Sequence, residues 1–326
     1  MNLPLVSICV PVYNVVPYIE RCVRSLMEQT YQNLEYIFVN DCSTDDSLSV
    51  LRKVLQDYPD RKQNTIIVNN DCNHGLAYTR RISIEHATGE YITCVDSDDY
   101  IDKEMVQCMI DKAIQTQADI VTAGYYNEWD ATTEIIEPYP IDQETDYIRL
   151  VLSDLLNSMC SRLFLRSLFS EGNNCYAPER MDYMEDKMAI FFLSTKARRI
   201  VSINKPLYHY AIRHNSISQN ISERHWKCLI RFFEEAERRL EELKLIDKYK
   251  DILGTHKIQM KAHHLMLCDN RSRKQYADLY AEEERLYKPK LTRGVALMYW
   301  LTKHHLWGLT YCYQCYINWL EHKTKR

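Results

Sequence analysis

Four aspartates gather in the sequence ITCVDSDDYID, which spans residues 92–102. They are Asp96, Asp98, Asp99 and Asp102, and Ser97 lies between the first two. Their oxygens are hard ligands, suited to Mg²⁺ or Mn²⁺ shared with a diphosphate. Acidic residues also favour the first turn of a helix, which explains Asp102 well and Asp99 in part. An Asp-x-Asp sequence directly after an apolar run is more than a helix start requires, so the stretch indicates a metal site beside the helix-capping alternative.

A second acidic pair, Glu185 and Asp186, lies in DYMEDKMAIFFLSTKA, residues 182–197. The pair precedes an apolar run, which is typical of a helix with an acidic first turn. A carboxylate on the acceptor side of a transfer reaction can also take the proton from an attacking hydroxyl. On this stretch alone the helix-start interpretation is the stronger of the two.

The apolar periodicity of the first 126 residues predicts the elements that position these acids. Residues 6–13 and 34–40 predict buried strands, and the residues between them have the i, i+3, i+4 spacing of a helix face. The same alternation continues with predicted helices over 43–55 and 76–87 and predicted strands over 64–70 and 90–95. This order predicts an α/β fold with a mostly parallel sheet flanked by helices.

The carboxyl ends of the predicted strands carry the candidate chemistry. Ligands of open parallel sheets bind just beyond these ends, and both Asp41 and the Asp96 cluster fall there. A further helix over 102–117 and a strand over 119–126 follow, and the pattern then becomes irregular as far as residue 222. From residue 223 onward the spacing predicts helices.

The composition excludes some classes of partner. The chain has 326 residues, 46% of them hydrophobic, which predicts a folded protein with one large domain or a main domain and a smaller one. Its 41 basic and 45 acidic side chains leave no excess of positive charge for a phosphate backbone, so nucleic acid is not an expected partner. The 12 cysteines are scattered along the chain, which favours a reducing cytoplasm over a disulfide framework.

The glycines exclude two ways of holding a nucleotide. The chain has 7 glycines, and none lies closer than 14 residues to the next, so neither a G-x-G-x-x-G sequence nor a P-loop is present. The phosphates of a bound nucleotide must therefore be held in another way, and a metal ion is the obvious substitute.

Two apolar regions bear on membrane contact. Residues 3–19 are interrupted by prolines and follow no basic residue, so no signal peptide is predicted. Residues 295–320 carry Lys303 and two histidines and predict a poor membrane-spanning helix. This aromatic stretch with its basic end at 323–326 fits either a helix lying on anionic lipid or helices packed against the main domain. We expect a cytoplasmic protein, with peripheral contact at the cytoplasmic face of the membrane as the open alternative.

Five segments together resemble a family 2 glycosyltransferase of the GT-A fold, of the type that builds polysaccharides and cell-envelope glycans. They are VSICVPVYN (6–14), SLMEQTYQNLEYIFVNDCSTDDS (25–47), NHGLAYTRR (73–81), GEYITCVDSDD (89–99) and MEDKMAIF (184–191). The resemblance covers roughly residues 5–220. It implies a GT-A catalytic domain over 1–222, with a nucleotide-binding half over 1–126 and an acceptor half over 127–222, followed by a helical region over 223–326.

The resemblance also implies roles for individual residues on the donor side. The turn formed by Pro11, Val12, Tyr13 and Asn14 matches the family's nucleotide pocket, and Asp41 matches the acid that reads the uracil ring. Asp96 and Asp98 match the family's DxD motif, in which the first acid lies near ribose or metal and the second binds the cation, Mn²⁺ or Mg²⁺. Ser97, between them, is assigned to the donor site. Arg80 matches a basic residue that faces donor phosphate or base.

Two further assignments follow from the later segments. Asp186 resembles the family's catalytic base, and the stretch LYHYAIRHNSIS (207–218) resembles a strand and loop that close over donor phosphates. Arg213 is the best candidate there for phosphate, since a guanidinium suits that geometry. His209 and Ser216 are weaker candidates, and an edge strand with solvated polar residues is the alternative.

The chain departs from the family pattern at two places. It has Asn40, Asp41, Cys42 and Ser43 where many members have Asp-Asp-Gly-Ser, which leaves the turn without its glycine. It also has Met159 to Arg162 where many members have a Trp-Asn-Lys segment, which leaves the role of Arg162 open.

The function expected from the resemblance is metal-dependent transfer of a sugar, with inversion, from a nucleotide donor to a hydroxyl of a glycan or lipid-linked glycan. The donor we expect is a UDP-sugar. A non-catalytic subunit that binds a nucleotide-sugar for a partner enzyme is the alternative. A nucleotidyltransferase would use a glycine-rich loop after the first strand, and the sequence VPVYNVVPY has no glycine.

Overall fold

The structure is a computed structural model that describes residues 3–129, 132–142, 145–153, 155–169, 181, 183–212, 221–287 and 291–324, with side chains as far as residue 316. The chain separates into two compact units, Met1–His214 and Asn215–Arg326. Each unit is described by itself below.

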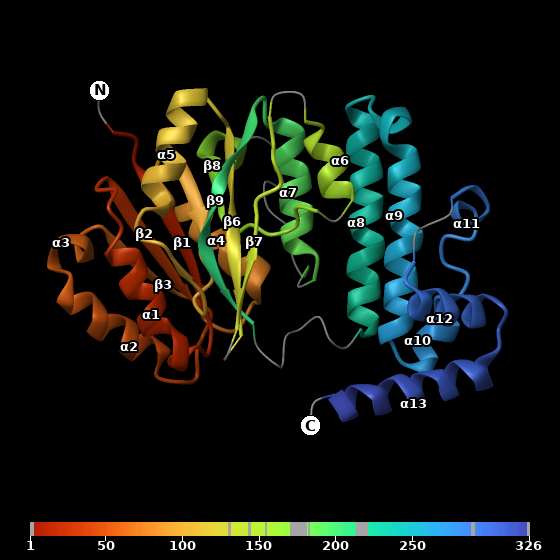
Figure 1. Ribbon diagram of the computed structural model, residues 1–326. Helices are drawn as coiled ribbons and strands as arrows, with labels where there is room; N and C mark the ends of the chain where they lie inside the picture. Colours follow the sequence, from red (N-terminus) through yellow and green to blue (C-terminus); the bar gives the residue numbers. More distant parts are fainter. Residues whose placement is uncertain are drawn as a thin grey trace. The chain divides into compact units, whose positions relative to one another are not determined.

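One sheet forms the framework of the first unit (Figure 1). Among the described residues it has nine strands in the order β3-β2-β1-β4-β8-β6-β9-β5, with β7 paired to β6. The strands are β1 (Val6–Val12), β2 (Leu34–Asn40), β3 (Thr65–Asn69), β4 (Tyr91–Cys94), β5 (Tyr100–Ile101), β6 (Ile120–Glu128), β7 (Thr133–Ile136), β8 (Arg162–Leu165) and β9 (Ile200–Ala211). Strands β1 to β4 are mutually parallel, which confirms the predicted βαβ half.

The second half of the sheet is mixed rather than parallel. Strand β8 runs antiparallel to both β4 and β6, whereas β6 and β9 are parallel. Because β8 is antiparallel, it begins at the edge of the sheet where β4 ends. Its first residue, Arg162, therefore lies at the same edge as the acids that follow β4.

Helices cover both faces of this sheet. They are α1 (Val16–Met27), α2 (Ser47–Val54), α3 (Pro59–Lys62), α4 (Leu76–His86), α5 (Met105–Thr116), α6 (Tyr147–Leu152) and α7 (Glu185–Lys196), with 3₁₀ turns at Leu55–Asp57 and Arg166–Phe169. Alternate residues of β1, which are Val6, Ile8 and Val10, share one buried core with the apolar faces of α1 and α5. Helix α4 packs on β1 and β2 from outside that core. Burying each large apolar side chain contributes about 1.5–3 kcal/mol, which fixes the strand ends in place.

The second unit is helical, as the sequence predicts. Its helices are α8 (Glu223–Glu242), α9 (Ile246–Leu267), α10 (Asn270–Gln275), α11 (Glu283–Leu286), α12 (Arg293–Lys303) and α13 (Trp307–Thr324). Trp226 and Phe232 are fully buried in its core. The buried Lys261 pairs with Glu284, which also accepts Lys303 at 3.1 Å. Among the described helices of the chain, none is long and apolar enough to span a membrane.

Candidate active site

Asp41 follows β2 and is held by the neighbouring loop. Its backbone N–H donates to the carbonyl of Val12 at 2.9 Å. Its carboxylate accepts from the side-chain amide of Asn70 at 2.8 Å and from the backbone N–H groups of His74 at 2.9 Å and Gly75 at 2.8 Å. A carboxylate offers about four lone-pair sites, so these three bonds leave acceptor capacity for a ligand.

The turn after β1 lies next to Asp41 in the sheet, because β1 and β2 are parallel neighbours. Pro11 and Val12 are buried, and Val12 belongs to the core. Tyr13 is 46% exposed, and Asn14 is also exposed. The side-chain oxygen of Asn14 accepts the backbone N–H of Thr44 at 2.9 Å, which ties this turn to the one after β2.

The second turn has a residue in the left-handed conformation where many family members have glycine. Cys42 occupies the position where many family members have glycine, and its φ of 59° is in the left-handed region. A side chain in that conformation costs about 1–2 kcal/mol. Its neighbour Ser43 accepts the backbone N–H of Asn14 at 3.2 Å through Oγ.

The acids after β4 form a tight turn. The backbone N–H of Asp99 donates to the carbonyl of Asp96 at 3.0 Å. Asp99 is buried and accepts the Tyr208 hydroxyl at 2.6 Å and the backbone N–H of Ala211 at 2.9 Å. Burial, followed by the charges of Asp96 and Asp98, raises the pKa of Asp99 to about 8. Asp99 therefore ties this turn to β9 and does not act as a helix cap.

Arg80 connects the two groups of acids that the sequence left separate. It lies on α4 and is 1% exposed. Its Nη2 donates to Asp96 at 2.6 Å, and its Nη1 donates to Asp186, with Glu185 at 3.7 Å from the same nitrogen. A single buried guanidinium thus links the first acid after β4 to the acidic pair at the start of α7.

The environment of Asp186 makes it a stronger base than a surface carboxyl. Its second oxygen accepts the backbone N–H of Met159 at 3.0 Å. Burial raises the pKa of Asp186, and the charge of Arg80 acts against that rise. Burial and the neighbouring Asp186 raise the pKa of Glu185 to about 7. The carboxylate of Asp186 is therefore oriented from two sides and partly desolvated.

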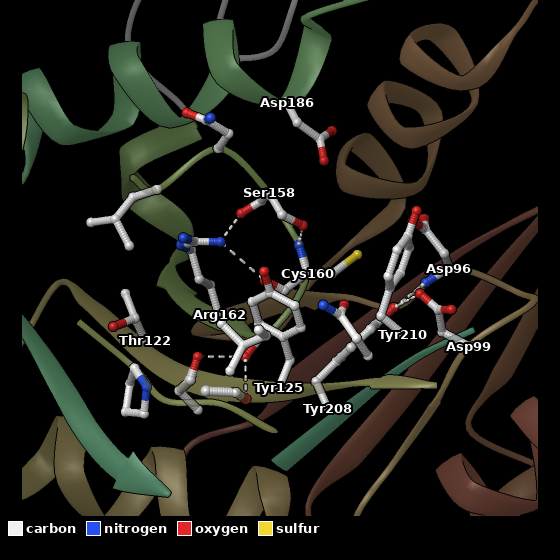
Figure 2. Close-up of a pocket in the computed structure, with 18 of the residues that line it drawn as sticks. Asp96, Asp99, Thr122, Tyr125, Ser158, Cys160, Arg162, Asp186, Tyr208 and Tyr210 are labelled. Atoms are coloured by element: carbon white, nitrogen blue, oxygen red, sulfur yellow. Dashed lines mark hydrogen bonds between the residues drawn. The ribbon is translucent and has the colours of Figure 1, made fainter. Parts of the chain in front are cut away.

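A cavity of about 630 Å³ lies beside these residues in the first unit (Figure 2). Arg80, Asp96 and Asp186 line it, together with the aromatic residues Tyr125, Tyr139, Tyr208 and Tyr210. The structure thus brings three of the predicted site residues to one cavity. The other assigned residues that are described do not line it; these are Pro11, Val12, Tyr13, Asn14, Asp41, Ser97 and Asp98. Arg213 and Ser216 lie outside the described residues.

Strand β9 shows which residues of the stretch 207–218 the sequence interpretation missed. Tyr208 and Tyr210 line the cavity, whereas His209 points to the opposite side of the strand. There it stacks on Tyr100 and Tyr126, with ring centroids 4.1 and 4.5 Å away. Successive side chains of a strand point to opposite faces, so Tyr208 and Tyr210 share one face and His209 lies on the other. Assigning residues 207–211 as a strand would therefore have predicted that the two tyrosines lie together.

The turn after β4 has the donor chemistry that a divalent cation requires. Asp96 and Asp98 are partly exposed, and their negative charges are close enough to contribute to the raised pKa of Asp99. Carboxylate oxygens such as those of Asp96 and Asp98 are the kind of ligand that Mg²⁺ or Mn²⁺ prefers. The residues present therefore fit such an ion. An exposed group of Asp71, Cys72 and His74 lies on the loop after β3, outside the cavity.

Comparison with known proteins assigns the family. The model of glycosyl transferase family 2 matches residues 7–172. The glycosyltransferase GlyG of Streptococcus pneumoniae is 27% identical over 291 residues, which cover 81% of this chain and 94% of that protein.

Solved structures share the fold. Staphylococcus aureus TarS 1-349 in complex with UDP-GlcNAc aligns with a TM-score of 0.62 and 19% identity over 86% of this chain and 87% of that one. The Pyrobaculum calidifontis mannosyltransferase PcManGT, in complex with GDP-Man and Mn²⁺, aligns with a TM-score of 0.56 and 17% identity over 94% of this chain and 86% of that one. The chain belongs to glycosyl transferase family 2, and its first unit has the GT-A fold.

Proposed function

We propose that this glycosyltransferase moves a sugar from a nucleotide-sugar donor, with a UDP-sugar as the first candidate, to a hydroxyl of a glycan or lipid-linked glycan. The reaction we propose is metal-dependent and inverting, and serves the synthesis of polysaccharides or cell-envelope glycans. The observation that carries the proposal is the link through Arg80 between Asp96 and Asp186 at one cavity. Arg80 thereby holds Asp96, the acid assigned to the donor, and Asp186, the base assigned to the acceptor, at fixed positions relative to each other.

The donor side is assigned to residues 1–126. The acceptor capacity left on Asp41 suits an N–H of the uracil ring, and the exposed side chains of Tyr13 and Asn14 lie at the adjacent turn. Asp96 and Ser97 are assigned to the sugar and ribose. Bound UDP-GlcNAc in TarS and bound GDP-Man in PcManGT support a nucleotide-sugar donor in this fold.

A divalent cation would be held by Asp98, with Asp96 beside it. When bound there, Mn²⁺ or Mg²⁺ offsets the negative charge that develops on the departing diphosphate. The Mn²⁺ named with the PcManGT complex supports a cation in general.

Asp186 is assigned as the base that takes the proton from the acceptor hydroxyl. Its raised pKa increases its basicity, while the contacts with Arg80 and Met159 hold the carboxylate in one orientation. Tyr139, Leu156 and Tyr210 contribute to the cavity wall, and residues 127–222 are assigned to the acceptor.

The helical region over 223–326 is assigned to peripheral contact with the cytoplasmic face of the membrane, where a lipid-linked acceptor resides. Large apolar side chains are exposed on α12 and α13, among them Trp300 at 52%, Leu309 at 55% and Tyr311 at 58%. Lys303 is half-exposed on the same α12. Aromatic and basic side chains on helices of this kind suit an anionic lipid surface.

Release of a nucleoside diphosphate tests whether the protein is an enzyme. The full chain with Mn²⁺ is incubated with a panel of UDP-, GDP-, CDP- and dTDP-sugars, with and without a mixed-glycan acceptor, and free nucleoside diphosphate is quantified. We expect release from one nucleotide class, stimulated by acceptor and abolished by a chelator. Binding of a donor with no release under any condition would instead indicate a non-catalytic subunit.

A further inference from the structure

Arg162 is a buried cation that the proposed mechanism does not use. It is the first residue of β8 and is 6% exposed. It also lines the 630 Å³ cavity. Figure 2 shows its side chain beside the ring of Tyr125, on the other side of that ring from Asp96 and Asp99. Its position is therefore separate from the acids that serve the donor.

The hydrogen bonds of Arg162 leave most of its guanidinium unused. Its Nη1 donates to the carbonyl of Ser158 and to that of Cys160, the latter at 3.1 Å. Its Nε is buried and has no hydrogen-bond partner among the described residues. Within the described part of the chain, no carboxylate is within ion-pair distance of it and Nη2 makes no hydrogen bond, although its charge reaches Asp186 and lowers the pKa of that carboxyl. The Nε–H and one N–H of Nη2, which form one edge of the fork, therefore have no hydrogen-bond partner in the described part of the chain.

A buried guanidinium with no anion in direct contact is costly, and a ligand that brings one reduces the cost. Nε and Nη2 form the edge of a fork whose spacing matches the two oxygens of a carboxylate or phosphate. Arg80 has a comparable burial but is already paired with acids, so Arg162 is the cation of the cavity wall that can receive an anion from a ligand.

The charge of the cavity decides which anion fits better. Its lining contains five acidic side chains, Asp96, Asp99, Glu137, Glu185 and Asp186, and two arginines, Arg80 and Arg162. A phosphate dianion would add two negative charges to a wall already rich in carboxylates. A carboxylate adds one, which Arg162 can neutralise by itself. The aromatic and aliphatic residues around it, including Tyr125 and Leu156, suit the body of a sugar ring.

We infer that Arg162 binds the carboxylate of an acidic sugar, and so gives the site a preference for a uronic-acid residue over its neutral counterpart. This inference rests on the proposed function and names the substrate class of the same cavity. The acidic sugar can enter on the donor or as the terminal residue of the acceptor, since the proposed function brings the transferred sugar and the acceptor hydroxyl to this cavity.

Paired ligands that differ only in the carboxylate test the inference. In the donor arm, calorimetry compares UDP-glucuronic acid with UDP-glucose in the presence of Mn²⁺. In the acceptor arm, methyl glucuronoside is compared with methyl glucoside on protein loaded with UDP and Mn²⁺. We expect the acidic member of one pair to bind about 10- to 100-fold more tightly, as hydrogen bonds to a charged group allow. Arg162→Met should remove that preference.

Arg162 also holds the loop that presents Met159 to Asp186, so a general weakening by Arg162→Met would not by itself support the inference. The ratio of acidic to neutral affinity separates the two roles, because loop disruption lowers both affinities alike. Arg162→Lys, which keeps the charge without the fork, should retain part of the preference. Arg166→Met is the matched control, because Arg166 is exposed and lies outside the cavity lining.

Three results would overturn the inference while leaving the proposed function intact. One is equal binding of the acidic and neutral members in both arms, and another is a preference that Arg162→Met does not change. A preference for a phosphorylated methyl glucoside over the glucuronoside would likewise contradict the carboxylate assignment. Failure of every nucleotide ligand to bind would count against the proposed function instead.

Discussion

Asp186→Asn is expected to reduce turnover by about 100-fold or more while leaving the affinity for the donor within about threefold. The amide cannot accept the acceptor's proton, yet it is nearly the same size and can still accept a hydrogen bond from Met159. The measurement is the rate of nucleoside diphosphate release at saturating donor and acceptor, with donor affinity measured separately by calorimetry.

Glu185→Gln is the matched control, because it removes the adjacent carboxyl and leaves Asp186 in place. Burial, Arg80 and Asp96 shift the pKa of Asp186, and Glu185, whose own pKa is raised to about 7, is not among the groups that move it. Glu185→Gln should therefore retain turnover, with the acid limb of the kcat profile close to its wild-type pH. If Asp186→Asn kept near-wild-type turnover, the assignment of the base would be wrong.

Asp98→Ala is expected to lower turnover by at least about 100-fold, because stabilisation of a leaving group supplies roughly 3 kcal/mol or more. The loss should come with a loss of the metal dependence of nucleotide binding, which a purely structural role would not cause. The measurement is turnover of the variant and of the wild type as a function of Mn²⁺ concentration.

Asp99→Asn controls for the charge of the same turn. With a pKa of about 8, Asp99 is largely protonated at neutral pH, so an amide replaces a group that is already uncharged. The amide oxygen can keep the bond from Ala211, and the amide NH₂ in place of the second oxygen can donate to the Tyr208 hydroxyl. We expect nearly normal metal dependence in this variant at pH 7. The same loss in Asp99→Asn and Asp98→Ala would show that the turn, and not the ligand at 98, is responsible.

The parallel half of the sheet could be predicted because short stretches of sequence determine its strands and helices. Strands β1 to β4 and the helices between them follow from apolar periodicity, and parallel neighbours joined by helices leave few other arrangements. The placement of β8 between β4 and β6 depends on pairing with residues far away in the sequence, such as Thr93 with Leu163. No local pattern encodes such a pairing, so the mixed half of the sheet was not predicted.

The residues of the candidate site also differ in whether the sequence alone could identify them. The acids at Asp96, Asp98 and Asp186 could be found from their own neighbours in the sequence. The partnership of Arg80 with Asp186 spans 106 positions, and it appears only when α4 and α7 are brought to the same sheet edge. Whether Arg162 has N–H groups left for a ligand depends on which carbonyl groups its guanidinium contacts in the folded chain. A sequence pattern does not predict those contacts.

Calorimetric titration of UDP, GDP, CDP and dTDP, each with and without Mn²⁺, tests the central claim most directly. It uses the full chain and requires no knowledge of the sugar or the acceptor. The account predicts that one nucleotide, with UDP as the first candidate, binds tightly with Mn²⁺ and much more weakly without it, and that Asp98→Ala loses this difference. Binding of none of the four nucleotides, with or without the metal, would contradict the account.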